Sequence, residues 1–352
     1  MTSTPLTSDV KPPAALTAGE RAAWAALCAQ HKHLRPPFFA PAFAEAVGRA
    51  VPEARVCVIS RDGVPVAFFP FQLLGPAGRL LRAAERLGGE ISDYFGLVAA
   101  PDFTIGEDEL LSLAGLDYLI FSHLDDGQKG NGLAGEEPRK GVRIDLSAGM
   151  AGYMTELRAA KKQMLRDTER RMRKIEQEHG PLKFVFESPE PDPVIDRLIA
   201  AKLEQYARTG KTNPTLGSAW AQGLLRDLAR GKDAGCRAVV SSLYAGEAWV
   251  AFHIGLRAGK VLHYWFPVYN HALKAFSPGR LLLMKIIESA DALGIGEIDR
   301  GEGDSPAKLD FANAEHFFYR GCWYRPGPRA FAFRALQAIR WRMAAQKADA
   351  GE

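Results

Sequence analysis

Several features that would point to a particular class of protein are absent from this sequence. The four cysteines lie far apart and form no C-x-x-C pair, which argues against a zinc ribbon or a redox dithiol. The eight histidines show no metal-ligand spacing, so we expect no metal. No run approaches the roughly eighteen apolar residues of a membrane span. The net charge is only +4, which gives no reason to expect DNA binding.

The first residues are polar and rich in proline, threonine and alanine. They have neither the basic start nor the apolar core of a secretory signal, so a cytoplasmic protein is expected. Because residues 1–19 show no hydrophobic periodicity, they are predicted to form a disordered tail.

The 352 residues, 47% of them hydrophobic, are enough for about two domains. In the first half, helical spacing predicts helices over 20–30 and 41–51. Asp62-Gly63 between two apolar runs predicts a β-hairpin, because these residues tolerate the positive φ of a tight turn. A short strand over 116–124 precedes a polar, glycine-rich loop. We assign residues 20–148 to an N-terminal domain.

The second half begins with a long charged helix over 151–178. A strand, two helices, a run of strands over 237–269, a helix over 277–294 and a strand over 297–301 follow. This order predicts an α/β fold with a mixed sheet over residues 149–328. The two halves also share a weak echo in the order of their elements, which makes a duplication plausible.

Several short motifs in the second half carry a resemblance to a known family. They are the aromatic strand end at 263–265, Tyr-Asn at 269–270, Ser-Pro-Gly before a leucine-rich helix at 277–283, and Gly-x-Gly-Asp with a lysine at 301–311. This segment resembles the second domain of the CelD/BcsL-type acetyltransferases of the GNAT superfamily. Two positions depart from the family pattern: Asn270 replaces an aspartate, and Ala307 replaces a tyrosine.

The resemblance implies two tandem GNAT-like domains, each with a mixed, mainly antiparallel sheet flanked by helices. It implies transfer of an acetyl group from acetyl-CoA to an amine or hydroxyl of a sugar, or of a lipid-linked saccharide, in exopolysaccharide synthesis. Two alternatives stay open. One is FemAB-like aminoacyl transfer to a cell-wall precursor, and the other is a degenerate GNAT pair that binds a small anion such as a cyclic dinucleotide.

The resemblance places coenzyme A between two splayed strands, with its pyrophosphate at the start of the following helix. Free N–H groups and the helix dipole make such a start an anion site. Proline fits the first helical turn, a serine can cap it, and glycine allows close approach of a phosphate. An ordinary capped helix is the alternative. The predicted cofactor-binding residues are Ser277, Pro278, Gly279, Arg280 and Leu281.

Acyl transfer needs a base for the incoming nucleophile and a donor for the departing thiolate. Asp93 is favoured as the base or acceptor anchor because it stands beside an aromatic residue in a glycine-flanked loop, although it could simply cap a turn. Lys308 could polarise a carbonyl or be a plain surface lysine. Histidines 253 and 263 are expected to be core or cleft-wall residues. The predicted catalytic residues are Asp93, Tyr94, Tyr264, Asp304 and Lys308.

Two basic features are candidates for acceptor or anion binding. The long helix carries a basic stripe, from which Arg166 and Arg170, together with Trp265, are predicted to bind the acceptor; such stripes are also commonly just solvated. Residues 329–352 are predicted to be a basic amphipathic tail that could contact the inner membrane peripherally. Arg325 and Arg329 have the R-x-x-x-R spacing of cyclic-dinucleotide readers. The alternative is a terminal helix that docks on the domain.

Overall fold

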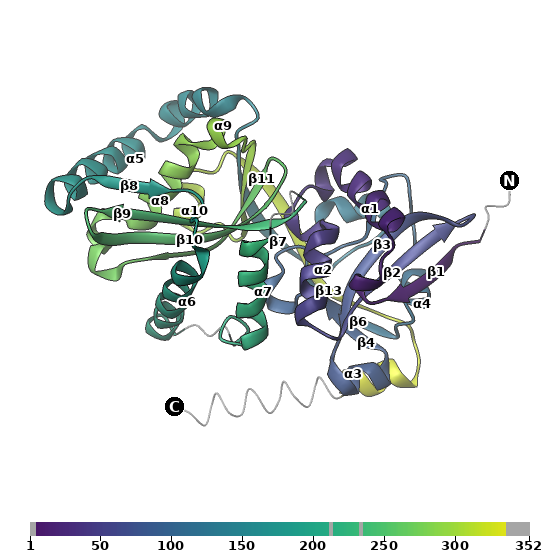
Figure 1. Ribbon diagram of the computed structural model, residues 1–352. Helices are drawn as coiled ribbons and strands as arrows, with labels where there is room; N and C mark the ends of the chain where they lie inside the picture. The colour runs from purple at the N-terminus through teal and green to yellow at the C-terminus, as the bar shows by residue number, and fades with distance from the viewer. Residues whose placement is uncertain (1–4, 211–213, 232–234, 336–352) are drawn as a thin grey trace. The chain divides into compact units, whose positions relative to one another are not determined.

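The protein is described by a computed structural model over residues 5–210, 214–231 and 235–335. The chain forms two compact units (Figure 1). Unit 1 takes its described residues from Met1–Lys32, Val47–Pro138 and Tyr319–Glu352, and unit 2 is His33–Ala46 with Arg139–Phe318. The units therefore differ from the predicted domains, because residues 33–46 belong to the second unit and residues after 318 belong to the first.

Unit 1 is built on strands in the order β1-β2-β3-β4-β6, with β5 beside β3. Neighbouring strands are antiparallel except β4 and β6, which are parallel. The predicted hairpin is confirmed, since Asp62 and Gly63 have φ of 52° and 77°. The strands are β1 (Thr7–Lys11), β2 (Ala54–Arg61), β3 (Val64–Leu73), β4 (Ala83–Arg86), β5 (Val98–Ala99) and β6 (Tyr118–Asp125).

Aromatic side chains fill the core of unit 1. Phe68 stacks on Trp24, while Phe69, Phe95 and Trp323 pack together on the other side of β3. Each such side chain contributes about 1.5–3 kcal/mol by its burial. The helices of unit 1 are α1 (Ala18–Gln30), α3 (Gly75–Leu81) and α4 (Glu107–Leu113), while α2 (Pro41–Ala50) begins in unit 2 and ends in unit 1.

Unit 2 has strands in the order β7-β12-β11-β10-β9-β8. Its strands are β7 (Glu137–Asp145), β8 (Leu182–Val185), β9 (Arg237–Ala245), β10 (Ala248–Ala258), β11 (Val261–Tyr269) and β12 (Glu297–Glu302), while β13 (Ala314–Tyr324) runs from this unit into unit 1. The helices are α5 (Gly149–His179), α6 (Pro191–Arg208), α7 (Ala219–Arg230), α8 (Pro278–Glu288), α9 (Ala290–Leu293) and α10 (Pro306–Leu309). Helices α6 and α7 lie on one side of the β8–β10 region and α5 on the other (Figure 1).

The two units share one topology. In unit 1, leaving out the short α3 and β5, the order β1, α1, β2, β3, β4, α4, β6 gives the strand sequence β1-β2-β3-β4-β6. In unit 2 the order β8, α6, α7, β9, β10, β11, α8, β12 gives β8-β9-β10-β11-β12. In both, the first three pairings are antiparallel and the last is parallel. The predicted tandem arrangement of two GNAT-like domains is confirmed.

Both predicted tails need correction. Residues 7–11 form β1, which pairs with β2 along Thr7–Lys11 and Val56–Ser60, so the prediction of a disordered segment to residue 19 is wrong. Strand pairing uses backbone groups, which need no hydrophobic pattern. At the other end, residues 328–335 are helical and bury Ala330 and Phe333, so the described part of the predicted tail docks on unit 1. The rest of that prediction lies outside the described residues.

No helix among the described residues is long and apolar enough to cross a membrane.

Candidate active site

Strands β11 and β12 run side by side for a short distance and then stop pairing. The parallel register joins Val261–His263 to Glu297–Asp299, although both strands continue, to Tyr269 and Glu302. The sheet therefore opens between their carboxyl ends. This is the splayed pair of strands that the resemblance implied.

The last pair before the opening is fixed by a buried hydrogen bond between an imidazole and a carboxylate. His263 Nδ1 lies 2.9 Å from Asp299 Oδ2, and the Gly301 amide donates to Asp299 Oδ1 at 2.9 Å. Burial would raise the pKa of Asp299, but the charge and hydrogen bond of His263 lower it overall. His316 Nε2 lies 4.0 Å from the same carboxylate, and burial lowers the pKa of His316 to about 4. His263 and Trp265 both pack on Phe38, on one face of β11.

Tyr264 and Arg300 are the first residues beyond the paired register, one on each strand. The Tyr264 ring stacks on His253 of β10 with centroids 4.1 Å apart, and the Arg300 guanidinium lies 5.1 Å from the ring centroid. A register shift between β10 and β11 falls at Gly255. A side chain there would meet His253 Cε1 at 2.5 Å, so the glycine leaves room for the imidazole. We call His253, Tyr264 and Arg300 the β11–β12 polar group.

Four polar atoms of this group lack partners among the described residues. The Tyr264 hydroxyl, both ring nitrogens of His253 and Nη1 of Arg300 are buried without a hydrogen bond. Burial raises the pKa of Tyr264 to about 12 and lowers the pKa of His253 well below its usual value. The phenol and the imidazole are therefore neutral near pH 7. Buried polar atoms are normally bonded, so such a concentration indicates a place where a ligand or water binds.

The start of α8 follows the carboxyl end of β11 along the chain, and its Arg280 bonds to Asp310, which comes directly after α10. Pro278 occupies the first turn as predicted, but Ser277 does not cap the helix through its side chain; it adopts a left-handed conformation with φ of 53°. An ideal Cβ on Gly279 would meet nothing within 4 Å, so the approach to this turn is open. Leu281 is buried in the core.

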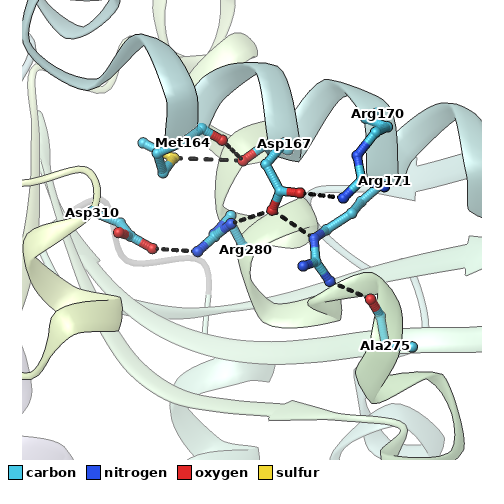
Figure 2. A network of polar contacts seen from close by, with 8 residues as sticks. Met164, Asp167, Arg170, Arg171, Ala275, Arg280 and Asp310 are labelled. Carbon is cyan, nitrogen blue, oxygen red and sulfur yellow. Dashed lines mark hydrogen bonds and ion pairs between the residues drawn. The ribbon is translucent and has the colours of Figure 1, made fainter.

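Arg280, predicted to bind the cofactor, is paired with two carboxylates. Its guanidinium bonds to Asp167 at 3.2 Å and to Asp310 at 2.8 Å (Figure 2). Asp167 also accepts from Arg170 and Arg171, and Arg171 donates to the Ala275 carbonyl just before α8. This network joins α5 to the start of α8.

Other predicted residues have different surroundings. Lys308 donates to the carbonyls of Arg300 at 2.6 Å and Glu302 at 2.5 Å, so it holds the end of β12 and is not a plain surface lysine. Asp304 is exposed. Asn270 caps the turn after β11, accepting from the Ala272 amide and donating to the Trp249 carbonyl.

Asp93 and Tyr94 belong to unit 1, and the β11–β12 polar group is formed without them. Asp93 is half-buried, and its charge opposes the fall in the pKa of Arg86 that burial causes. The Tyr94 ring is buried, and its carbonyl accepts from the Ser92 hydroxyl.

The predicted basic residues differ in whether carboxylates already pair with them. Arg166 is exposed on α5, while Arg170 is paired with Asp167 at 2.6 Å. Arg325 lies 3.4 Å from Asp108, and Arg329 lies 3.4 Å from Asp117. The two arginines of the R-x-x-x-R motif therefore already face carboxylates, which compete with a bound anion. No cluster of metal-ligating side chains occurs within the described ranges.

The comparisons with known proteins agree with this geometry. A model of the acetyltransferase (GNAT) domain family matches residues 162–309, which include β11, α8 and β12. No curated protein sequence matches the chain. Among solved structures, FemX matches with a TM-score of 0.56 at 10% identity, over 89% of this chain and 97% of FemX. A protein of unknown function from Bacteroides thetaiotaomicron matches with 0.54 at 11% identity, over 89% and 98%.

A tandem GNAT protein from the clavulanic acid biosynthesis pathway matches with a TM-score of 0.49 at 13% identity, over 92% of this chain and 100% of that one. The chain has a mixed α/β, GNAT-like fold, and residues 162–309 match the GNAT acetyltransferase domain family. At such low identities the likeness to FemX and the Bacteroides protein concerns the fold alone. The CelD/BcsL subfamily stays a prediction.

Proposed function

We propose that this protein transfers an acetyl group from acetyl-CoA to an amine or hydroxyl of a sugar, and that unit 2 binds the donor. The observation that carries the proposal is the parting of β11 and β12 at Tyr264 and Arg300, within the segment that matches the acetyltransferase family. The sugar acceptor and a role in exopolysaccharide synthesis rest on the motifs at 263–311.

The choice of unit 2 is supported by the two equivalent helices. In unit 1, α4 begins with Glu107, Asp108 and Glu109, whose charges would repel a pyrophosphate at the helix start. In unit 2, α8 begins with Pro278 and Gly279 and has no acidic residue in its first turn. An anionic cofactor therefore fits α8 better than α4.

The chemistry follows from the protonation states. The incoming amine or hydroxyl attacks the thioester carbonyl, the new C–N or C–O bond forms, and the C–S bond breaks. Tyr264 holds its proton at neutral pH and can give it to the departing thiolate. The proton of the nucleophile goes to solvent. Solvent then returns a proton to Tyr264.

Replacement of Gly279 by leucine tests the donor site. The new side chain meets no protein atom at its Cβ and requires no strained φ, so the fold should tolerate it while the pyrophosphate loses its approach. Gly223→Leu is the matched control, because Gly223 also lies in a helix of unit 2 with open space around it. Calorimetry with acetyl-CoA should show weaker binding for Gly279→Leu alone. Unchanged affinity would place the donor elsewhere.

FemAB-like aminoacyl transfer is the second candidate, and the match to FemX over 97% of that chain favours it. The two candidates differ in their donor. Incubation with acetyl-CoA and with aminoacyl-tRNA in parallel, followed by mass spectrometry of the acceptor, separates them. Transfer from the tRNA alone would replace the acetyl-CoA proposal.

A further inference from the structure

The β11–β12 polar group contains buried polar atoms without hydrogen-bond partners. The side chains of His253 and Tyr264 are 0% and 6% exposed, and their polar atoms have no partner among the described residues. Leaving each such atom unbonded costs about 1–3 kcal/mol. Two stacked side chains with this property, beside the unbonded Nη1 of Arg300, therefore indicate a binding site.

The group also carries a positive charge. Tyr264 and His253 are neutral for the reasons given above, whereas Arg300 remains a cation because arginine does not deprotonate in proteins. Its Nη1 atom is buried without a hydrogen bond.

The neighbouring carboxylates are occupied by other groups. Asp299 accepts from His263 and from the Gly301 amide, and Asp310 accepts from Arg280. A ligand that completes the group must therefore bring both hydrogen-bond acceptors and negative charge. A planar guanidinium binds carboxylates and phosphates through paired hydrogen bonds, and a phenol beside it adds a further donor.

We propose that the β11–β12 polar group selects an acyl acceptor that carries an oxyanion, either a carboxylate or a phosphate ester, close to the amine or hydroxyl that is acylated. This inference rests on the proposed function and specifies its acceptor class. Arg300 is then a specificity-determining residue, with Tyr264 and His253 completing the contacts to the oxyanion.

Binding without turnover tests the inference directly. The full chain is saturated with coenzyme A, which forms a dead-end complex, and three amino sugars are titrated in by calorimetry. Glucosamine has no oxyanion, glucosamine 6-phosphate has a phosphate ester, and muramic acid has a carboxylate. We expect at least one of the two anionic sugars to bind about tenfold or more tightly than glucosamine, and the preferred one identifies the oxyanion.

Variants of Arg300 test whether this residue causes the preference for anionic sugars. Arg300→Gln should remove the discrimination and leave the affinity for coenzyme A unchanged, and Arg300→Lys should restore part of it because the charge is kept. Arg226→Gln is the matched control, since Arg226 is an arginine of unit 2 that is ion-paired with Asp196 on the surface. A circular dichroism spectrum and a melting curve for each variant show that it is folded.

The outcomes separate the two proposals. Wild-type protein that binds coenzyme A but treats the three sugars alike overturns this inference and leaves the acetyl-CoA proposal standing. The protein could instead prefer the anionic sugars through Arg300 and fail to bind coenzyme A. That result overturns the acetyl-CoA proposal. If Arg300→Gln loses affinity for coenzyme A and keeps its discrimination among sugars, the group serves the donor and the inference is wrong.

Discussion

His263 Nδ1 lies 2.9 Å from Asp299 Oδ2, and the two residues form the last paired position of β11 and β12. Both side chains are almost fully buried. The other Asp299 oxygen accepts from the Gly301 amide, where the chain turns with φ of 63°. One carboxylate thus fixes both the end of the pairing and the path of β12 beyond it, and so it sets the position of Arg300.

Replacing this carboxylate by an amide should weaken the fold. Asp299→Asn keeps the shape but loses the charge on hydrogen bonds to His263 and Gly301, at a cost of about 2–3 kcal/mol in the free energy of unfolding. Urea denaturation measures the difference. Asp196→Asn removes an exposed ion pair and should cost at most about 1 kcal/mol. Equal losses in the two variants would contradict a special role for Asp299.

The hydroxyl of Tyr264 gives the opposite expectation for stability. Because it is buried without a partner, Tyr264→Phe should leave the free energy of unfolding unchanged or raise it by up to about 1 kcal/mol. Acetyl transfer should nevertheless fall by about 10²-fold or more, since the thiolate loses its proton donor. Denaturation and steady-state kinetics on the same samples check both parts. Lower stability with normal turnover would assign the hydroxyl a structural role.

Stability should depend on pH through His253. Burial lowers the folded-state pKa of His253 well below the value of 6.5, so the unfolded chain takes up the proton first. The stability is therefore not reduced by His253 above about pH 6.5, and the free energy of unfolding declines as the pH falls below that value. His316, with a pKa of about 4, acts in the same direction.

Removing the imidazole should reduce this slope. In His253→Phe, denaturation between about pH 7 and 5 should show a decline that is smaller than in the wild type by up to about 1.4 kcal/mol per pH unit. A phenyl ring can keep the stacking contact with Tyr264. Parallel declines in the two proteins would show that the imidazole is protonated in the folded state or contacts water.

Much of the fold could be predicted because many helices and strands follow from local sequence patterns. The long amphipathic stripe predicts α5, and apolar runs separated by turns predict strands β9 to β12. Strand β1 was missed because backbone pairing with β2 holds it, and its side chains are mostly exposed. Ser277 was expected to cap α8, but tertiary packing gives it a left-handed backbone that no local rule for serine indicates.

The site was harder to predict than the fold. The aromatic strand motif indicates Tyr264, whereas the sequence pattern around Asp299 and Arg300 predicts only a strand. Their roles depend on contacts over 36 residues of sequence and on the point where a register ends. A charged pair just before Gly301-x-Gly303 was the available indication, since charges inside a short buried strand need partners.

Asp93 should affect turnover more than folding. Its charge favours the protonated form of the buried Arg86, so Asp93→Asn should cost about 1–3 kcal/mol of stability. If Asp93 is the base or anchors the acceptor, kcat should fall by about 10²-fold or more. Asp102→Asn, at an exposed aspartate of the same unit, is the control. A lower melting temperature with equal activity would make Asp93 a structural residue.

Two phenylalanines near the C-terminus decide whether this segment belongs to the fold. Phe333 is 4% exposed and packs on Tyr118 with ring centroids 4.7 Å apart, while Phe331 is 77% exposed. Phe333→Ala should lower the free energy of unfolding by about 3 kcal/mol, and Phe331→Ala should change it by less than about 0.5 kcal/mol. Urea denaturation of both variants measures this.

If the C-terminal segment acts only by binding anions, we expect a different result. In that case neither substitution would alter unfolding, and Phe331→Ala would reduce co-sedimentation with anionic vesicles through loss of an apolar contact. The ion pairs of Arg325 and Arg329 with Asp108 and Asp117 favour docking, because an anion must displace two carboxylates to reach these arginines. Loss of about 3 kcal/mol in Phe333→Ala, with unchanged sedimentation of Phe331→Ala, would therefore assign the described C-terminal residues to the core of unit 1.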